Sequence, residues 1–294
     1  MSTEATGRPS IAGVDVSRVA LYAALLAMVL FYLAPLESGL ATAFKTPDGF
    51  RTTTPFALPP LGEFTVDAWG TAFDRLGSGL VNSALMAVPA TVLSALFGSL
   101  AAYGLTNLDW RGQVGVLLLF VAGVFIPYQA VLVPLTQFWS FVDLAGRLPI
   151  SAVDQYEGLI NLSITHVAYG VPICTVLFRS YYATIDDEML EAARLDGASA
   201  ATIYRRIVLP LSVPIFAVTL IYQFTQIWND LLFAIVLVSD PSNQVVTVAL
   251  NQLQGSFVQQ YNLQMAGAFV AALPALVVYV LFGEQFAKGV AGET

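Results

Sequence analysis

Six long apolar runs dominate the sequence and limit what the chain can fold into. A helix needs about 20 apolar residues to cross about 30 Å of hydrocarbon. Runs of roughly this length lie near residues 19–36, 80–105, 114–138, 159–181, 211–238 and 265–286. Hydrophobic residues make up 57% of the chain and charged residues only 11%, against about 25% charge in a soluble domain. We therefore predict an all-α membrane protein with about six transmembrane helices.

The positive charges of the flanking segments predict the orientation. Cytoplasmic loops carry more Lys and Arg than outer loops do. With the N-terminus inside, the inner segments hold eight of these residues and the outer segments hold four. We therefore expect a multi-pass protein of the cell membrane with cytoplasmic tails at residues 1–18 and 287–294. An aromatic cap is expected outside at residues 37–79, before a five-helix core at residues 80–286.

Composition excludes several classes of function. The net charge of −8, with no basic patch, argues against a nucleic-acid partner. The single cysteine, Cys174, has no second thiol for a disulfide or a metal site, so we interpret it as a buried apolar residue. The sequence holds neither a P-loop of the form GxxxxGK[ST] nor a clustered catalytic constellation. We expect no metal, no cofactor and no enzymatic activity in this chain.

The inner segment at residues 182–210 predicts two short helices joined at a corner. Thr184 is expected to cap the first helix, followed by three acidic residues that suit the positive end of its dipole. Gly197 stands where a left-handed residue would end that helix. Ser199 can cap the second helix, and Pro210 can enter the first turn of the next span. From the residues alone, a docking knob for a partner and a plain folded loop both remain open.

The same segment resembles the EAA loop of binding-protein-dependent ABC importer permeases. Glu191-Ala192-Ala193 is followed after three residues by Gly197, and after nine more by Ile207-Val208-Leu209-Pro210. Other segments are similar to the carbohydrate branch of this family, in particular to its smaller maltose-permease-type subunit: Ser99 to Tyr103, Ile126-Pro127, Leu132 to Pro134 and Trp228-Asn229-Asp230.

This resemblance implies a type I permease architecture in which the EAA loop is the coupling helix. It implies a second homologous permease subunit, two ATPase subunits that bind ATP and Mg, and an extracellular substrate-binding protein as partners, with a sugar as substrate and membrane lipid around the spans. The residues implied in ATPase coupling are Glu191, Ala192, Ala193, Asp196, Gly197, Ile207, Leu209 and Pro210.

A polar stripe in the fifth apolar run is a candidate substrate pathway. Tyr222, Gln226 and Asn229 follow i, i+4, i+7 spacing and share a helix face, and Gln223 and Asp230 lie next to it. A charged Asp230 in mid-membrane would cost about 2.5–3.5 kcal/mol, so it should face water or a partner. Amides and aromatic rings suit a sugar. Hydrogen bonding between helices, or a position of Asp230 at the outer rim, are the alternatives.

An outer loop at residues 239–264 offers a second candidate contact. Its central part resembles the external loop of the family that faces the binding protein. The residues expected at this contact are Gln254, Gly255, Ser256 and Phe257.

Small residues and prolines in the spans predict packing and bends. Ala90, Ser94, Gly98 and Ala102 recur at steps of four and predict a groove for a neighbouring helix. Prolines inside or near the ends of spans can be gating hinges or ordinary residues of membrane helices. They are Pro89, Pro127, Pro134, Pro172, Pro210, Pro214 and Pro274.

Two other functions remain compatible with a polytopic membrane chain. An ion-coupled secondary carrier would need ionisable residues inside the membrane, for which only Asp230 and His166 qualify. His166 has no acidic neighbour in sequence, and we expect it to be packed and neutral. A non-transport membrane scaffold that retains the docking loop is the second alternative.

Overall fold

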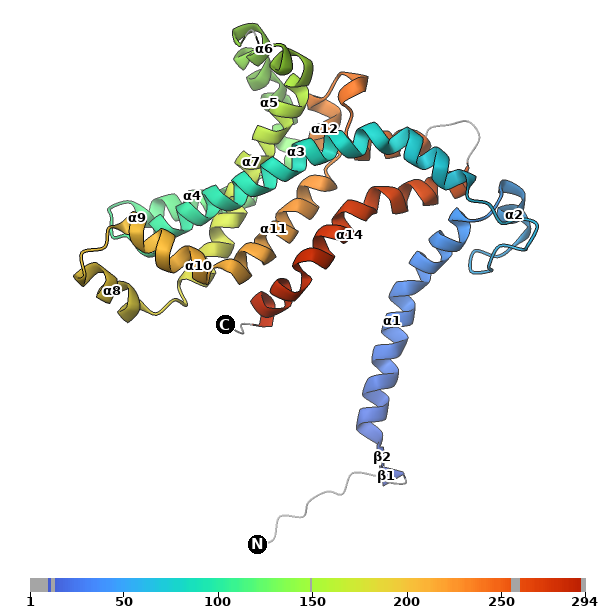
Figure 1. Cartoon of the computed structure of the whole chain (residues 1–294), viewed down its shortest axis with the longest axis horizontal. Coiled ribbons are helices and arrows are strands. Elements are labelled where there is room, and N and C mark those ends of the chain that lie inside the picture. The colour runs from blue at the N-terminus through green and yellow to red at the C-terminus, as the bar shows by residue number, and fades with distance from the viewer. Residues whose placement is uncertain (1–9, 12–13, 149, 255–259, 292–294) are drawn as a thin grey trace. The chain divides into compact units, whose positions relative to one another are not determined.

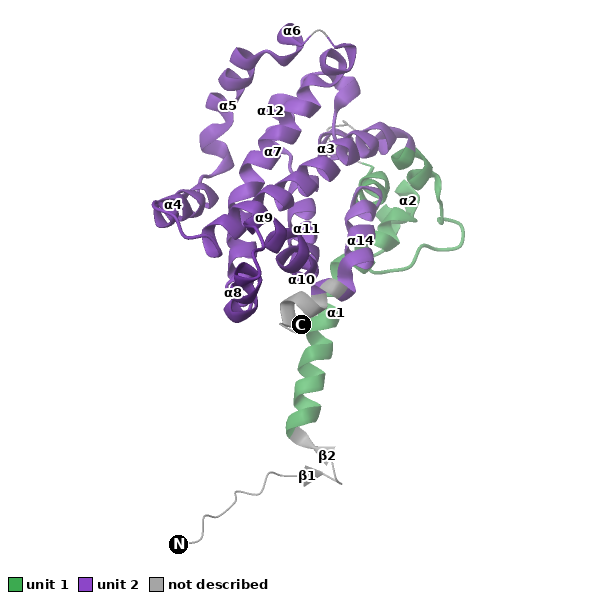
Figure 2. Ribbon diagram, turned by 60° about the vertical axis from the view of Figure 1, so that its left-hand side comes forward, with its two compact units in different colours: residues 1–73, 256–269 green, residues 74–255, 270–294 purple. Residues whose placement is uncertain are grey.

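The computed structural model describes residues 10–11, 14–148, 150–254 and 260–291, and helices make up nearly all of them (Figure 1). The strands within those residues are β1 (Ser10–Ile11) and β2 (Val14–Asp15), which pair antiparallel. Two compact units are present, Met1–Phe73 with Ser256–Phe269 and Asp74–Gly255 with Val270–Thr294 (Figure 2). Each unit is described by itself.

The helices follow one another along the chain with few long connections. The first half holds α1 (Val16–Ala43), α2 (Pro47–Thr52), α3 (Asp67–Thr106), α4 (Gln113–Val124), α5 (Tyr128–Val142), α6 (Leu144–Arg147) and α7 (Ser151–Tyr182). The second half holds α8 (Asp187–Leu195), α9 (Ala200–Ile203), the π-helix η1 (Tyr204–Val208), α10 (Leu209–Leu211), α11 (Val213–Trp228), α12 (Leu232–Leu237), the 3₁₀ turn η2 (Pro241–Asn243), α13 (Val246–Gln254) and α14 (Tyr261–Ala291).

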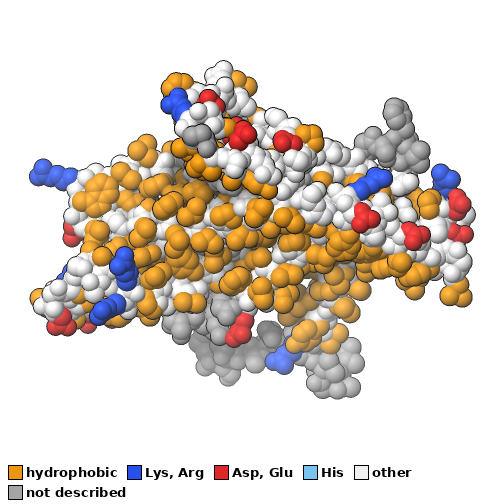
Figure 3. All heavy atoms as spheres, turned by 45° about the horizontal axis from the view of Figure 1, so that its top comes forward, with side chains coloured by type: hydrophobic (Ala, Val, Ile, Leu, Met, Phe, Trp, Pro, Cys, Tyr) orange, Lys and Arg blue, Asp and Glu red, His pale blue; other side chains and the backbone are white. Residues whose placement is uncertain are grey.

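The predicted number of membrane spans agrees with these helices. Within the described residues, four helices are long and apolar enough to cross a membrane: Ser17–Ala43, Asp67–Thr106, Ser151–Tyr182 and Tyr261–Glu284. Two bent pairs, Gln113–Val124 with Tyr128–Arg147 and Ala200–Leu211 with Val213–Trp228, bring the number to six if each pair is one span. Hydrophobic side chains cover much of the visible surface, where water would disfavour them (Figure 3). The predicted all-α membrane fold is confirmed.

Helices extend beyond the apolar runs that predicted them. α1 continues to Ala43 rather than ending at Leu36, and α3 begins at Asp67 rather than near Leu80. The segment expected as an outer cap is therefore partly helical extension, with α2 between the two helices. Hydrophobicity marks the part of a helix in hydrocarbon, whereas backbone hydrogen bonding continues into the polar ends.

The third and fifth apolar runs are broken rather than continuous. A bend of 102° separates α4 from α5, because Pro127 lacks an N–H and disfavours helical geometry at Ile126. A bend of 75° at Ser212 precedes α11, whose first turn holds Pro214. The helix then stops at Trp228 and resumes at Leu232 as α12.

The first unit contains a set of packed aromatic rings. Phe44 stacks on Phe64 with ring centroids 5.5 Å apart, and it contacts Trp69 at 5.1 Å. Phe50 stacks on Tyr261 at 4.8 Å. Aromatic pairs of this kind add stability beyond the area that they bury.

In the second unit, the predicted small-residue groove is confirmed at Gly98. A Cβ at this position would lie 2.4 Å from the Cβ of Cys174 and 3.0 Å from the backbone N of Thr175, so α3 and α7 approach at their backbones. Cys174 is buried and free, as predicted. Helix interiors accommodate Pro89, Pro134, Pro172 and Pro274.

Candidate functional site

Helix α8 begins later than the sequence suggested. The predicted cap Thr184 is wrong, because its hydroxyl donates to the carbonyl of Tyr181 at 2.7 Å and completes the turn that ends α7. Asp186 caps α8 instead, accepting from the backbone N of Glu188 at 2.9 Å. A carboxylate is favoured at this positive end of the helix.

The end of α8 has the geometry predicted for Gly197. Its φ of +81° lies in the left-handed region. The backbone N of Ala198 donates to Ala193 O, and that of Gly197 donates to Arg194 O, both at 3.0 Å. These two bonds form a Schellman motif, which ends a helix sharply.

The second short helix also begins as predicted. Ser199 Oγ accepts from the backbone N of Thr202 at 3.2 Å at the start of α9. Sequence reasoning missed the π-helix that follows, and Pro210 lies in α10, before the 75° bend rather than after it. Pro214 takes the expected place in the first turn of the long helix α11.

The residues implied in ATPase coupling divide by exposure. Glu191, Ala192, Asp196, Gly197 and Pro210 are exposed, whereas Ala193, Ile207 and Leu209 are half-buried against the chain's own core. Two leucines of α8 also differ in exposure. Leu190 is buried, and Leu195 is 89% exposed. α8 therefore has one face fixed to this chain and another face that is free.

Hydrogen bonds tie this loop to the helices behind it. The hydroxyl of Ser99 on α3 lies 2.6 Å from Tyr182 Oη and 2.8 Å from Tyr204 Oη. Tyr103 Oη donates to Ala200 O at 3.0 Å, and Arg194 Nη2 donates to Asn107 O at 2.7 Å. Ser99 and Tyr103 are the ends of a segment that carried the family resemblance, although neither was predicted to hold the loop.

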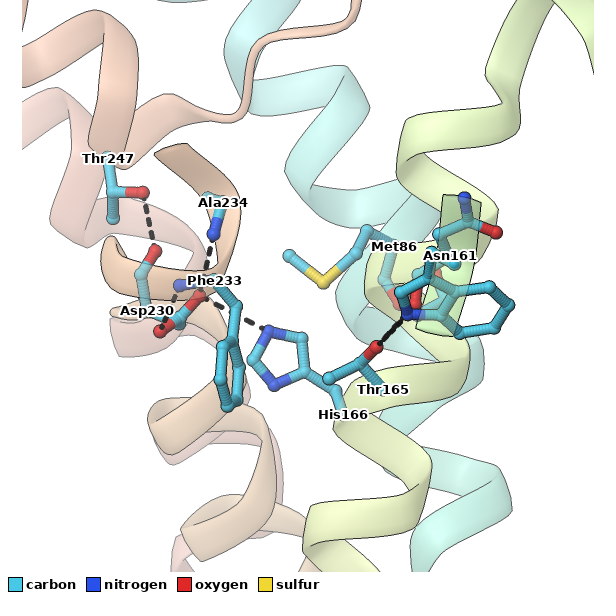
Figure 4. A network of polar contacts seen from close by, with 10 residues as sticks. Met86, Asn161, Thr165, His166, Asp230, Phe233, Ala234 and Thr247 are labelled. Atoms are coloured by element: carbon cyan, nitrogen blue, oxygen red, sulfur yellow. Dashed lines mark hydrogen bonds and ion pairs between the residues drawn. The ribbon is translucent and has the colours of Figure 1, made fainter. Parts of the chain in front are cut away.

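Asp230 does not face an open path. Its Oδ2 lies 3.5 Å from His166 Nε2 on α7, and both side chains are 3% exposed (Figure 4). Its carboxylate also accepts from the backbone N of Phe233 at 3.5 Å and of Ala234 at 3.2 Å, the first turn of α12. The expected partner of Asp230 is therefore inside the chain, and it is the histidine predicted to be packed.

The five residues of the predicted pathway separate into two groups. Tyr222, Gln226 and Asn229 are exposed on one face of α11. Gln223 is buried, with its amide against Gly170 and Cys174, and Asp230 is buried as well. The helical spacing predicted the shared face, but adjacent positions turn about 100° away from it.

The expected binding-protein contact lies mostly outside the described residues. Gly255, Ser256 and Phe257 are not described, and Gln254 ends α13. In the preceding loop, Ser242 donates to the Asp240 carboxylate from its backbone N and its hydroxyl, each at 2.8 Å. These bonds hold the pKa of Asp240 below its ordinary value.

A protein-family model matches residues 94–290. It describes the "binding-protein-dependent transport system inner membrane component". This chain belongs to that family. The match includes the EAA loop, so the resemblance found in the sequence is confirmed. The family consists of transport permease subunits, which are membrane proteins and not enzymes.

Similar proteins cover almost the whole chain. It is 48% identical over 291 residues to the xylose/arabinose import permease protein of Haloferax volcanii, covering 95% of this chain and 94% of that one. It is 40% identical to a probable ABC transporter permease protein of Pyrococcus horikoshii, covering 93% and 95%. A bacterial ABC transporter for import of the acidic polysaccharide alginate shares the fold, with a TM-score of 0.73, 18% identity, and coverage of 95% and 99%.

Proposed function

We propose that this chain is a transmembrane subunit of an ABC sugar importer. It forms half of the pathway with a second homologous permease, and works with two ATPase subunits and an extracellular substrate-binding protein. ATP and Mg bind to the ATPase subunits. The 48% identity to a xylose/arabinose import permease makes these two pentoses the first substrates to test. A glucose import permease of Saccharolobus solfataricus, 29% identical over 91% of both chains, supports sugars as the class.

The geometry of α8 is the observation that carries the coupling role. A helix that must transmit force should be fixed on one side and free on the other. α8 is fixed through Leu190, Arg194 and the Tyr182–Ser99–Tyr204 bonds, and it ends at the Schellman motif of Gly197. Its free face offers Glu191 to an arginine of the ATPase, and Leu195 to an apolar socket.

The proposal places the coupling helix on the cytoplasmic side and the polar residues of α11 on the sugar pathway. With both termini in the cytoplasm, α8 lies on the inner side, where the ATPase subunits are. Tyr222, Gln226 and Asn229 face the sugar pathway. Gln223 and Asp230 are buried and stabilise α11 and α12 through contacts inside the chain. Residues 254–257 contact the binding protein, and a Gly/Ser linker in their place should lower uptake.

A coupling experiment tests this function. The complete importer is co-expressed, purified from membranes and reconstituted with its binding protein, and uptake of radiolabelled D-xylose and L-arabinose is measured beside ATP hydrolysis. Glu191→Ala should insert and assemble normally but import less sugar per ATP. Glu188→Ala is the matched control, because it removes an exposed glutamate from the same helix.

Two outcomes would contradict the proposal. Normal import per ATP by Glu191→Ala would show that coupling does not depend on this residue. Purification of a stable chain without any ATPase or second permease, as judged by mass spectrometry, would count against the importer assembly itself.

A further inference from the structure

Aromatic side chains that follow the breaks in the third and fifth apolar runs lie in contact with each other and with a tyrosine of the fourth run. Tyr128 is the first residue of α5 after the 102° bend, and Phe233 belongs to α12 after the interruption of the fifth run. Their rings stack with centroids 4.6 Å apart. Tyr169 of α7 lies 5.0 Å from Tyr128 and 5.1 Å from Phe233. Three separate elements therefore build one aromatic cluster.

Polar groups border this cluster without partners in the chain. Within the described residues, no hydrogen bond reaches the hydroxyls of Tyr128, Tyr169 and Tyr222 or the amide of Gln226. Tyr222 and Gln226 are exposed, and Tyr128 and Tyr169 are half-buried.

Tyrosines at the EAA loop behave differently. The hydroxyls of Tyr103, Tyr181, Tyr182 and Tyr204 all bond to groups of this chain. Inside a membrane, unpaired polar groups are strongly disfavoured. The free hydroxyls near the breaks therefore require water, a ligand or a group of the second permease.

Tyr128 has several polar neighbours. Its ring centroid lies 5.0 Å from that of Tyr169, and Tyr222 and Asp230 lie close to its hydroxyl. Gln226 follows Tyr222 by one turn on α11. The carboxylate of Asp230 is occupied by His166 and by the first turn of α12. A surface of hydroxyls, one amide and ring faces suits a neutral, hydroxyl-rich molecule better than an ion.

We propose that Tyr128, Tyr169, Tyr222 and Gln226, here named the tyrosine shelf, contact the sugar during passage. An aromatic face receives the C–H face of the sugar ring, and the free hydroxyls and the amide exchange hydrogen bonds with sugar hydroxyls. Phe233 lies under Tyr128 and holds its ring. This inference rests on the proposed import function, and it adds that this subunit itself binds the sugar rather than only lining a passage.

Tyrosine-to-phenylalanine variants test the shelf, because they remove the hydroxyls and keep the rings. The triple variant Tyr128→Phe, Tyr169→Phe, Tyr222→Phe is compared with Tyr279→Phe, which removes an exposed tyrosine hydroxyl from α14. Co-purification of all subunits checks assembly. Each complex is trapped with ATP and vanadate, and the radiolabelled D-xylose or L-arabinose that it retains is counted. Import into proteoliposomes is measured in parallel.

We expect each lost hydroxyl to weaken retention by about 2- to 10-fold, so the triple variant should retain and import far less sugar. ATP hydrolysis stimulated by the binding protein should remain within about 2-fold of wild type, because a lost hydrogen bond to the sugar does not touch the coupling loop. Tyr279→Phe should match wild type throughout. If the triple variant retains and imports sugar like wild type, the shelf is wrong. A wild-type complex that imports neither pentose would instead overturn the proposed function with these substrates.

Discussion

The imidazole Nε2 of His166 lies 3.5 Å from the carboxylate Oδ2 of Asp230, and this contact joins α7 to the start of α12. Both side chains are 3% exposed. Because the same carboxylate also accepts two backbone N–H groups of α12, the pair fixes the place where the fifth apolar run is interrupted.

Removing either member of this pair should destabilise the chain. We expect His166→Ala and Asp230→Ala each to lower the free energy of unfolding by about 1–3 kcal/mol, since each removes one side of a buried polar contact. After His166→Ala, the carboxylate of Asp230 still accepts from the two backbone N–H groups of α12. The double variant should lose less than the sum, by about 0.5–3 kcal/mol. The free energies of unfolding of the two single variants and the double variant are measured by denaturation in detergent. Strictly additive losses would show that the two residues do not interact. Asp240→Ala, which removes an exposed capping carboxylate, is the control.

The close approach of α3 and α7 predicts a steric effect at Gly98. Gly98→Ala would place a Cβ 2.4 Å from that of Cys174, so the helices must separate at a cost of about 1–3 kcal/mol. Gly104→Ala in the same helix meets nothing within 4 Å, and should be neutral or stabilising by up to about 1 kcal/mol. Thermal unfolding of the two variants compares them. Equal stability would mean that the groove is open.

Backbone geometry predicts a graded effect at Gly197. A Cβ there meets no neighbour within 4 Å, but the φ of +81° is a backbone conformation that most residues other than glycine rarely adopt. We expect Gly197→Ala to cost about 1–2 kcal/mol and to lower sugar import per ATP. Gly197→Asn should be milder, because asparagine tolerates this region. Import and ATP hydrolysis are measured together, and an alanine variant as well coupled as the asparagine variant would contradict the geometric explanation.

Ser99 should matter for the attachment of the loop. Ser99→Ala leaves the hydroxyls of Tyr182 and Tyr204, 1% and 8% exposed as residues, without this partner. We expect a loss of about 1–3 kcal/mol in the free energy of unfolding, together with lower import per ATP. Ser94→Ala, on the same helix, removes a hydroxyl that bonds only to its own helix at Ala90 O. An equal effect of the two variants would indicate general destabilisation.

Local signals in the sequence predicted the EAA loop well, because caps and left-handed glycines act over a few residues. Gly197 and Ser199 take the predicted roles, whereas the cap predicted at Thr184 lies at Asp186, and the π-helix and the place of Pro210 before the bend were not predicted. Both residue types cap helices, and the turn that closes α7 decides between them.

Contacts between spans that are distant in the chain could not be predicted from the sequence. His166 and Asp230 lie on different helices, and nothing near either residue indicates the other. Proline positions were visible, but whether a span breaks depends on what packs around it. Pro127 stands at a break between two helices, whereas Pro172 lies inside α7, whose kink is at Tyr156 instead. The same limit explains why Gln223 was placed with the exposed stripe, since spacing alone does not say which face meets the core.

Leu195 is 89% exposed at the end of α8, on the face that we propose enters the ATPase. Without that partner, the leucine side chain is in contact with water. Docking of the ATPase would remove it from water, so the hydrophobic effect would favour assembly at this point, by up to about 1.5–3 kcal/mol if the side chain becomes fully buried.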